Sequence, residues 1–329
     1  MYDAPVNHVG SAGLTVYVPF PFSVRRVEGM RGTLLLAASM ATAVLVACGA
    51  AVLVAVPVVG QTSTATLVGA GDIAGCSERG DSSATARLLG NIGGSVYTLG
   101  DNVQGQGDIN EFRNCYDPTW GKYKKRTKPA VGNHEYHTTG AKPYYDYFGA
   151  RAGSPRRGYY SYDLKSWHVV VLNSNCGQVG GCESGSPQGR WLRNDLQNNR
   201  SRCTVAYFHH PLQATGTNTP SPQVRPFWSM LHNRGADVIL SGHAHRYERH
   251  APMTPGGKRS ANGIRQFVVG TGGADGGAEI HKSQTPNLQE VEVGTPGVLR
   301  LSLRADSYAW KFVPIAGKNF TDSGTDRCH

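Results

Sequence analysis

Short apolar runs, each closed by a glycine and a polar side chain, dominate the pattern of the first half of the chain. Residues 64–70, 95–99 and 129–131 are runs of this kind, followed by Gly-Asp, Gly-Asp-Asn and Gly-Asn-His. Strands that recur about every thirty residues, with helical segments between them, are typical of successive βα units. Ligands of such sheets bind beyond the carboxyl ends of the strands, so we expect the three turns to converge.

The second half continues the pattern with strands that end in histidines. Residues 205–208 predict a buried strand that ends at His209-His210-Pro211, and residues 236–240 predict another that ends at Gly242-His243-Ala244-His245. No internal repeat or low-complexity linker divides residues 66–329, so we predict one domain over residues 63–329. The remaining predicted elements are a helix from 83 to 89, paired strands at 159–163 and 167–172, helices at 188–198 and about 227–233, and strands at 266–270 and within 297–312.

The N-terminal 62 residues contain a long apolar segment. No charged residue occurs from Gly32 to Gly71, and residues 34–59 are almost wholly apolar. Arg25, Arg26 and Arg31 precede that run, as in a secretory signal, and residues 1–29 lie upstream of a second plausible start at Met30. The run is long enough to span a bilayer, so a cleaved signal peptide and a retained anchor both stay open. Cleavage after small residues at 63–65 is one interpretation, and a lipobox-like motif ending at Cys48 is another. Either predicts bacterial-type export, with the domain secreted or anchored to the outer face of the cell membrane.

Composition narrows the function classes. The formal charge of +10 favours anionic ligands, but there is no long basic run, and nucleic-acid binding is not indicated. Beyond the leader, the six cysteines are even in number and lack Cys-x-x-Cys spacing, so we expect disulfides. We expect Cys76–Cys115, Cys176–Cys182 and Cys203–Cys328, although only the short middle loop has a sequence argument. The chain also lacks a Gly-x-Ser-x-Gly elbow and a phosphate-binding Gly-x-x-x-x-Gly-Lys loop, which argues against a serine hydrolase and an ATPase.

The polar residues at the strand ends form a set of metal ligands. Carboxylates, an amide and imidazoles suit two divalent or trivalent ions. Two ions about 4 Å apart can activate a bridging water as hydroxide and hold phosphoryl oxygens. The candidates are Asp72, Asp101, Asn133, His134, His209, His243 and His245, while His210 is either a further contact or structural. We interpret His168, His232, His250 and His281 as ordinary histidines, and Tyr247 and Arg249 as packing residues rather than parts of a pocket rim.

In this order, the motifs resemble the calcineurin-like metallophosphoesterases over about residues 66–275. Glu135 after Asn-His, and Arg246-Tyr247-Glu248-Arg249 after the last histidine, resemble the purple acid phosphatase branch in particular. The resemblance implies a four-layer α/β/β/α sandwich with two metal ions, Fe, Zn or Mn, at the sheet edges.

The resemblance also implies a role for each residue. Asp101 would bridge both ions, Asp72 and His245 would complete one side, and Asn133, His209 and His243 the other. His134 would act as the general acid on the leaving group or contact the phosphate.

Two positions depart from the family pattern. Ala74 stands where the general family has a histidine, and Gln104 where purple acid phosphatases have a tyrosine. The first ion therefore lacks its usual extra protein ligand, which water, Gln104 or Asn102 could replace. We expect a weaker, exchangeable first ion and no ferric charge-transfer colour.

The predicted function is hydrolysis of small phosphate monoesters by a metal-bridging hydroxide. A phosphodiesterase or nucleotidase using the same site is the alternative among enzymes. A surface binding protein that has lost activity is the alternative from another class. The oligomeric state does not follow from the sequence.

Overall fold

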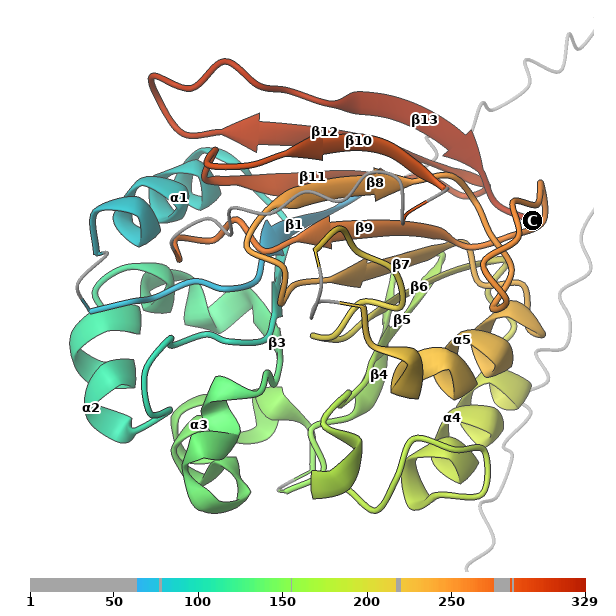
Figure 1. Ribbon diagram of the computed structural model, residues 1–329, viewed down its shortest axis with the longest axis horizontal. Coiled ribbons are helices and arrows are strands. Elements are labelled where there is room, and N and C mark those ends of the chain that lie inside the picture. Colours follow the sequence, from blue (N-terminus) through green and yellow to red (C-terminus); the bar gives the residue numbers. More distant parts are fainter. Residues whose placement is uncertain (1–63, 77–78, 155, 217–219, 275–284, 286) are drawn as a thin grey trace, which may run out of the picture. The chain divides into compact units, whose positions relative to one another are not determined.

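Two β-sheets form the centre of the protein, in a computed structural model that describes residues 64–329 apart from 77–78, 155, 217–219, 275–284 and 286 (Figure 1). The apolar segment over residues 34–59 and His281 lie outside the described residues. In chain order the elements are β1 (Ala65–Ala70), α1 (Arg79–Asn91), β2 (Ser95–Leu99), α2 (Ile109–Glu111), a π-helical turn (Phe112–Tyr116), β3 (Thr127–Ala130), α3 (Lys142–Phe148), β4 (Tyr160–Leu164), β5 (Trp167–Val171), α4 (Pro187–Asn198), β6 (Cys203–Tyr207), α5 (Arg225–His232), β7 (Val238–Ser241), β8 (Tyr247–His250), β9 (Arg265–Val269), β10 (Leu288–Glu292), β11 (Gly297–Leu303), β12 (Ser307–Pro314) and β13 (Ser323–Arg327).

The first sheet has the order β13-β12-β11-β1-β2-β3. Strands β1, β2 and β3 are adjacent and parallel, which confirms the predicted βα units. Because parallel strands end at the same edge of a sheet, the turns after these three strands lie side by side. Strands β11 to β13 extend the sheet in antiparallel fashion on the other side of β1.

The second sheet has the order β10-β8-β9-β7-β6-β5-β4, and β5, β6, β7 and β9 are parallel. Side chains along β5 to β7 alternate between two hydrophobic clusters, as expected of strands buried on both faces. Val169, Val205 and Leu240 pack in the cluster shared with the first sheet. Val170 and Ala206 pack with the buried residues of α4 and α5. The two sheets therefore face one another, and these helices cover the outer face of the second, consistent with the predicted α/β/β/α sandwich.

Three disulfides join the cysteines as expected. They are Cys76–Cys115, Cys176–Cys182 and Cys203–Cys328. The last one ties the C-terminus to the start of β6, 125 positions away in sequence. By closing long loops, such bridges restrict the unfolded chain most.

The structure adds a helix to the elements predicted from the sequence. Helix α3, whose Tyr144 and Phe148 are buried, is not among the elements predicted from the sequence. Strand β8 includes Tyr247 and Arg249, and Asp322 accepts hydrogen bonds from both side chains. Both residues therefore have the packing role expected of them.

Among the described residues, no helix is both long enough and apolar enough to cross a membrane.

Candidate metal centre

Three of the candidate ligands adopt left-handed backbone conformations. The φ angles are 57° at Asp72, 45° at Asp101 and 68° at His243. Non-glycine residues seldom adopt this conformation, and such strain concentrates at functional sites. Each of the three residues comes within two positions of a strand end, where the chain turns sharply and aims the side chain across the sheet edge.

Glycines in the turns make room for the aspartates. A Cβ atom at Gly132 would lie 2.1 Å from Asp101 Oδ1, and one at Gly242 would lie 2.5 Å from Asp72 Oδ2. Both distances are far below a normal contact, so the Gly-Asn and Gly-His pairs are required by close packing of the turns. Hydrogen bonds to the same oxygens fix the turns together: the backbone N–H of His134 donates to Asp101 Oδ1, and that of His243 donates to Asp72 Oδ2.

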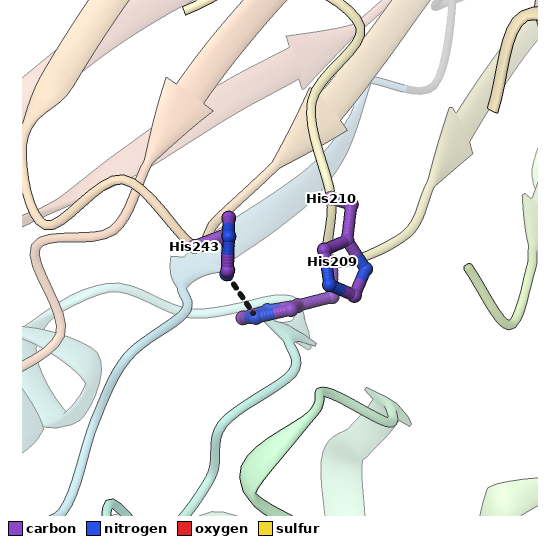
Figure 2. Close-up of side chains that lie close together, drawn as sticks. All are labelled: His209, His210 and His243. Carbon is purple, nitrogen blue, oxygen red and sulfur yellow. Dashed lines mark hydrogen bonds between the residues drawn. The ribbon is translucent and has the colours of Figure 1, made fainter. Parts of the chain in front are cut away.

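His209 lies at the centre of the cluster and is fully buried. Its Nδ1 donates to the Leu99 carbonyl at 2.8 Å, so in the neutral ring Nε2 carries the lone pair. That lone pair faces Asn133 Oδ1 at 2.8 Å and Asp101 Oδ2 at 3.2 Å. His243 Nδ1 lies 3.2 Å from the same nitrogen (Figure 2). Four possible ligand atoms thus converge, and a cation can bind all of them at once.

A second group of acceptors surrounds Asp72. Asp72 is buried, and its Oδ1 accepts no hydrogen bond from any described residue. His245 Nε2 lies 3.4 Å from that oxygen. One ligand atom from each of Asp72, Asp101 and His209 lies within 4.8 Å of the others. The orphaned carboxylate oxygen and the donor set therefore fit a second cation beside the first.

The electrostatics agree with a site built for positive charge. Burial raises the pKa of Asp101, but the charge of His209, a hydrogen bond with it and the nearby His134 outweigh burial and leave the pKa well below its usual value. Burial lowers the pKa of His209, but Asp101 outweighs it and raises the pKa to about 9. Burial and His209 lower the pKa of His243 to about 4. With no ion bound, a single proton on His209 takes the place that a cation would fill.

His134 lies at the mouth of the centre, with 28% of its side chain exposed. Its Nδ1 is 3.2 Å from the Gly105 carbonyl, which fixes the ring as an Nδ1–H donor. Nε2 is then on the side of the centre, 3.8 Å from Asp101 Oδ2. The exposed His137, which was not among the predicted site residues, lies beside it with the ring planes tilted by 55°, and its Nδ1 is 2.9 Å from the same carbonyl.

Glu135 is the buried residue that ties these turns together. Its two carboxylate oxygens accept backbone N–H bonds from Asp101, Asn102, Val103 and Gly132. Burial and the Asp101 charge raise the pKa of Glu135, and the bond from Gly132 acts in the opposite direction. The motif Asn-His-Glu contained this residue, but nothing in the sequence indicated that it would bridge two loops.

The departures from the family pattern leave a gap at the Asp72 side. Ala74 is buried and pairs through its backbone with Val103. The Gln104 side chain donates to the Asp101 carbonyl at 3.3 Å, and Asn102 donates to the Ala130 carbonyl at 3.1 Å. Both amide groups are therefore already held by the backbone through their nitrogens. Asn102 Oδ1 accepts no hydrogen bond from the described residues, so it stays a candidate for the gap.

The other histidines divide into two groups. His168 and His250 are buried and paired with carboxylates, His168 with Asp163 and Asp195 and His250 with Glu248. Their interpretation as ordinary histidines missed these ion pairs. His210 packs against His209 and His243, with ring centroids at 4.8 and 4.6 Å (Figure 2).

A pocket of about 260 Å³ opens beside the centre. His245 and Gly270 are among the residues that line it, and a Cβ atom at Gly270 would lie 2.9 Å from Asp72 Oδ2. The lining also includes the polar residues Asp81, Thr271, Thr295 and Lys318.

Comparison with known proteins agrees with this fold. The family model of the calcineurin-like phosphoesterases matches residues 66–247, more than half of the chain. Purple acid phosphatase 21 of Arabidopsis thaliana is 26% identical over 223 residues, which are 60% of this chain and 49% of that protein. Purple acid phosphatase 22 of the same plant is 26% identical over 254 residues, 68% of this chain and 55% of that protein. The chain thus spans about half the length of these relatives.

Among solved structures, the purple acid phosphatase from yellow lupin seeds has a TM-score of 0.67 with this chain. It is 18% identical, with 81% of this chain and 54% of that chain covered. This likeness supports the fold. From the family match, the chain belongs to the calcineurin-like phosphoesterases, and its curated relatives are purple acid phosphatases.

Proposed function

We propose that this protein is an exported metal-dependent phosphatase that hydrolyses small phosphate monoesters at a dinuclear centre. The observation that carries the proposal is the convergence of Asp101, Asn133 and His243 on the lone pair of His209, with the orphaned Asp72 carboxylate beside it. Such a donor set has no use without cations. Six cysteines in three disulfides support export.

Each residue has a distinct task in this proposal. Asp101 would be shared by both ions, Asn133, His209 and His243 would hold one of them, and Asp72 and His245 the other. When bound, the ion pair would supply a water-derived nucleophile at neutral pH and neutralise phosphoryl charge. The Leu99 carbonyl orients His209, and Glu135 holds the turns that carry Asp101 and Asn133.

His134 would deliver the proton to the leaving alkoxide. The Gly105 carbonyl holds its Nδ1–H, so the proton to be transferred would sit on Nε2, which faces the centre. Its partial exposure allows the ring to regain a proton from solvent after each turnover.

The Asp72 side would hold its ion more weakly than the His209 side. Fewer protein ligands are available there because Ala74 and Gln104 replace the usual extra ligand. The polar pocket beside His245 would take the alcohol part of the substrate. The same pocket has room for the second ester arm of a diester, so a phosphodiesterase is the alternative.

The test is hydrolysis of p-nitrophenyl phosphate and of its bis-ester by the purified protein, with metal content measured on the same sample. We expect metal-dependent turnover of the monoester, abolished in Asp101→Ala and strongly reduced in His134→Ala with the metals retained. Preference for the bis-ester would favour the phosphodiesterase. A folded protein that binds metal and turns over neither ester would overturn the proposal in favour of a binding protein.

A further inference from the structure

Ser174 makes two hydrogen bonds to a single residue, His210. Its Oγ accepts the backbone N–H of His210 at 3.0 Å and lies 2.8 Å from His210 Nδ1. Ser174 is buried, with 1% of its surface exposed, and follows Asn173 after the end of β5. His210 follows β6, the next strand of the sheet, so the pair bridges two strand-end turns.

These two contacts determine which nitrogen of the ring carries the hydrogen. Ser174 Oγ uses one lone pair for the backbone N–H, and its own hydrogen needs an acceptor. Among the described residues His210 Nδ1 is the one acceptor within hydrogen-bond distance. A buried hydroxyl without an acceptor is costly, so the hydroxyl donates to Nδ1. A neutral ring then carries its hydrogen on Nε2.

The position of that N–H distinguishes His210 from its neighbours. His210 is partly exposed, and the hydrogen bond of its ring to a described residue is made by Nδ1, not by Nε2. The ring packs against His209 and His243, the two proposed ligands of one ion (Figure 2). One ring nitrogen from each of the three histidines lies within 4.8 Å of the others. By proximity alone His210 would pass for a third imidazole ligand, but a nitrogen that carries hydrogen cannot bind a metal ion.

We propose that His210 donates its Nε2–H to a phosphoryl oxygen of the substrate, and that Ser174 is the positioning residue that fixes this tautomer. The inference rests on the proposed function, because the oxygen it would contact belongs to a phosphate at the centre. A preorganised donor beside the ions stabilises the charge that develops on the phosphoryl oxygens. His210 therefore contributes to phosphate affinity and turnover without holding a metal.

The tautomer is tested first, on the metal-free protein. Long-range ¹H–¹⁵N correlation spectra distinguish Nδ1–H from Nε2–H imidazoles, and His210→Gln identifies the signal. We expect His210 as the Nε2–H form in the wild type and a mixture in Ser174→Ala. An Nδ1–H form in the wild type would overturn the inference. This measurement does not depend on activity.

The contact is tested with metal-loaded variants. We expect His210→Phe to keep two ions per chain, to lower kcat by on the order of a hundredfold, and to weaken inorganic phosphate binding measured by calorimetry. His210→Gln keeps an N–H near the position of Nε2 and should recover much of both. Ser174→Ala should reduce kcat less than His210→Phe does, with unchanged metal content. His250→Phe, which removes a buried histidine outside the centre, is the control for general loss of packing.

The outcomes separate the two proposals. Loss of one ion in His210→Phe would make His210 a ligand and overturn the inference while leaving the phosphatase proposal intact. Unchanged kcat and phosphate affinity would make His210 structural. If the wild type turned over no ester, phosphate affinity of the metal-loaded variants would still decide the role of His210.

Discussion

Two buried histidines at opposite ends of the neighbouring parallel strands β5 and β6 have different roles. His168 lies near the start of β5, with Nδ1 3.0 Å from Asp163 and Nε2 2.8 Å from Asp195. His209 lies just after the end of β6, with one nitrogen on a carbonyl and the other facing three acceptor atoms. The first ring has one carboxylate for each nitrogen, with the Asn199 amide also 2.8 Å from Nδ1. The second ring has several possible ligand atoms around one nitrogen.

The two sites differ in how many neighbouring atoms a single proton on the ring can satisfy. A protonated His168 donates once to each aspartate, so a proton completes that cluster. The Nε2–H of a protonated His209 can point at only one of the three atoms around it. It makes no hydrogen bond to Asp72 Oδ1, which stays without a partner among the described residues. A cation can accept several ligands at once. We infer that His168 is a structural ion pair and that His209 belongs to a metal site.

The largest expected effect comes from His209→Leu. Loss of a ligand removes an ion that supplies several kcal/mol of transition-state stabilisation, so activity should fall by on the order of a thousandfold. Metal content, measured by elemental analysis, should fall with it. The metal-free variant should also be less stable than the metal-free wild type, because the buried Asp101 carboxylate loses the protonated His209 that compensates its charge. Full metal content in this variant would contradict the comparison.

A smaller effect is expected from Glu135→Gln. The amide places an N–H₂ where a carboxylate oxygen accepts backbone N–H bonds, so the turns of Asp101 and Gly132 are pushed apart. Residues that orient metal ligands change metal affinity or activity by about 10–100-fold. Metal titration followed by calorimetry measures the change.

The matched control for Glu135→Gln is Asp237→Asn. Asp237 is also a buried carboxylate that accepts two backbone N–H bonds, from Thr204 and His329, and it lies just before the start of β7, at the opposite end of that strand from His243. This variant should lose stability and keep its metal affinity. Equal losses of metal affinity in the two variants would mean that Glu135 acts only through general stability.

The smallest effect is expected from His168→Gln, and it depends on pH. Burial lowers the pKa of His168, but hydrogen bonds with Asp195 and Asp163 outweigh burial and raise it. The ion pair therefore stabilises the fold fully below the unfolded pKa of about 6.5, and the contribution fades as pH rises through the higher folded pKa. The variant should lose about 1–2 kcal/mol of unfolding free energy at pH 5 and less at pH 9.

Denaturant unfolding at the two pH values measures the His168 effect, and metal content should not change. A loss that is the same at both pH values would show that packing, rather than charge, accounts for the role of His168.

The parts of the fold that could be predicted are those with local signals. The apolar runs of β1, β2, β6 and β7 are long enough to identify, and the Gly-Asp and Gly-His turns after them mark the edge where the candidate ligands meet. Strand β13 was missed because Ser323–Arg327 is polar and largely exposed, so its assignment depends on pairing with β12 rather than on its own pattern. Helix α3 was missed because its aromatic residues show no simple period.

The sequence by itself determined the ligand types, their order and the glycines that let the turns approach one another, because these depend on the chemistry of single residues and their neighbours. Only the tertiary structure decided what each nitrogen and oxygen faces. His168 and His209 are both histidines beside strands, and Ser174 is 36 positions from the ring it orients. Hydrogen bonds between turns of different strands depend on the packing of the whole sheet, which no local pattern encodes.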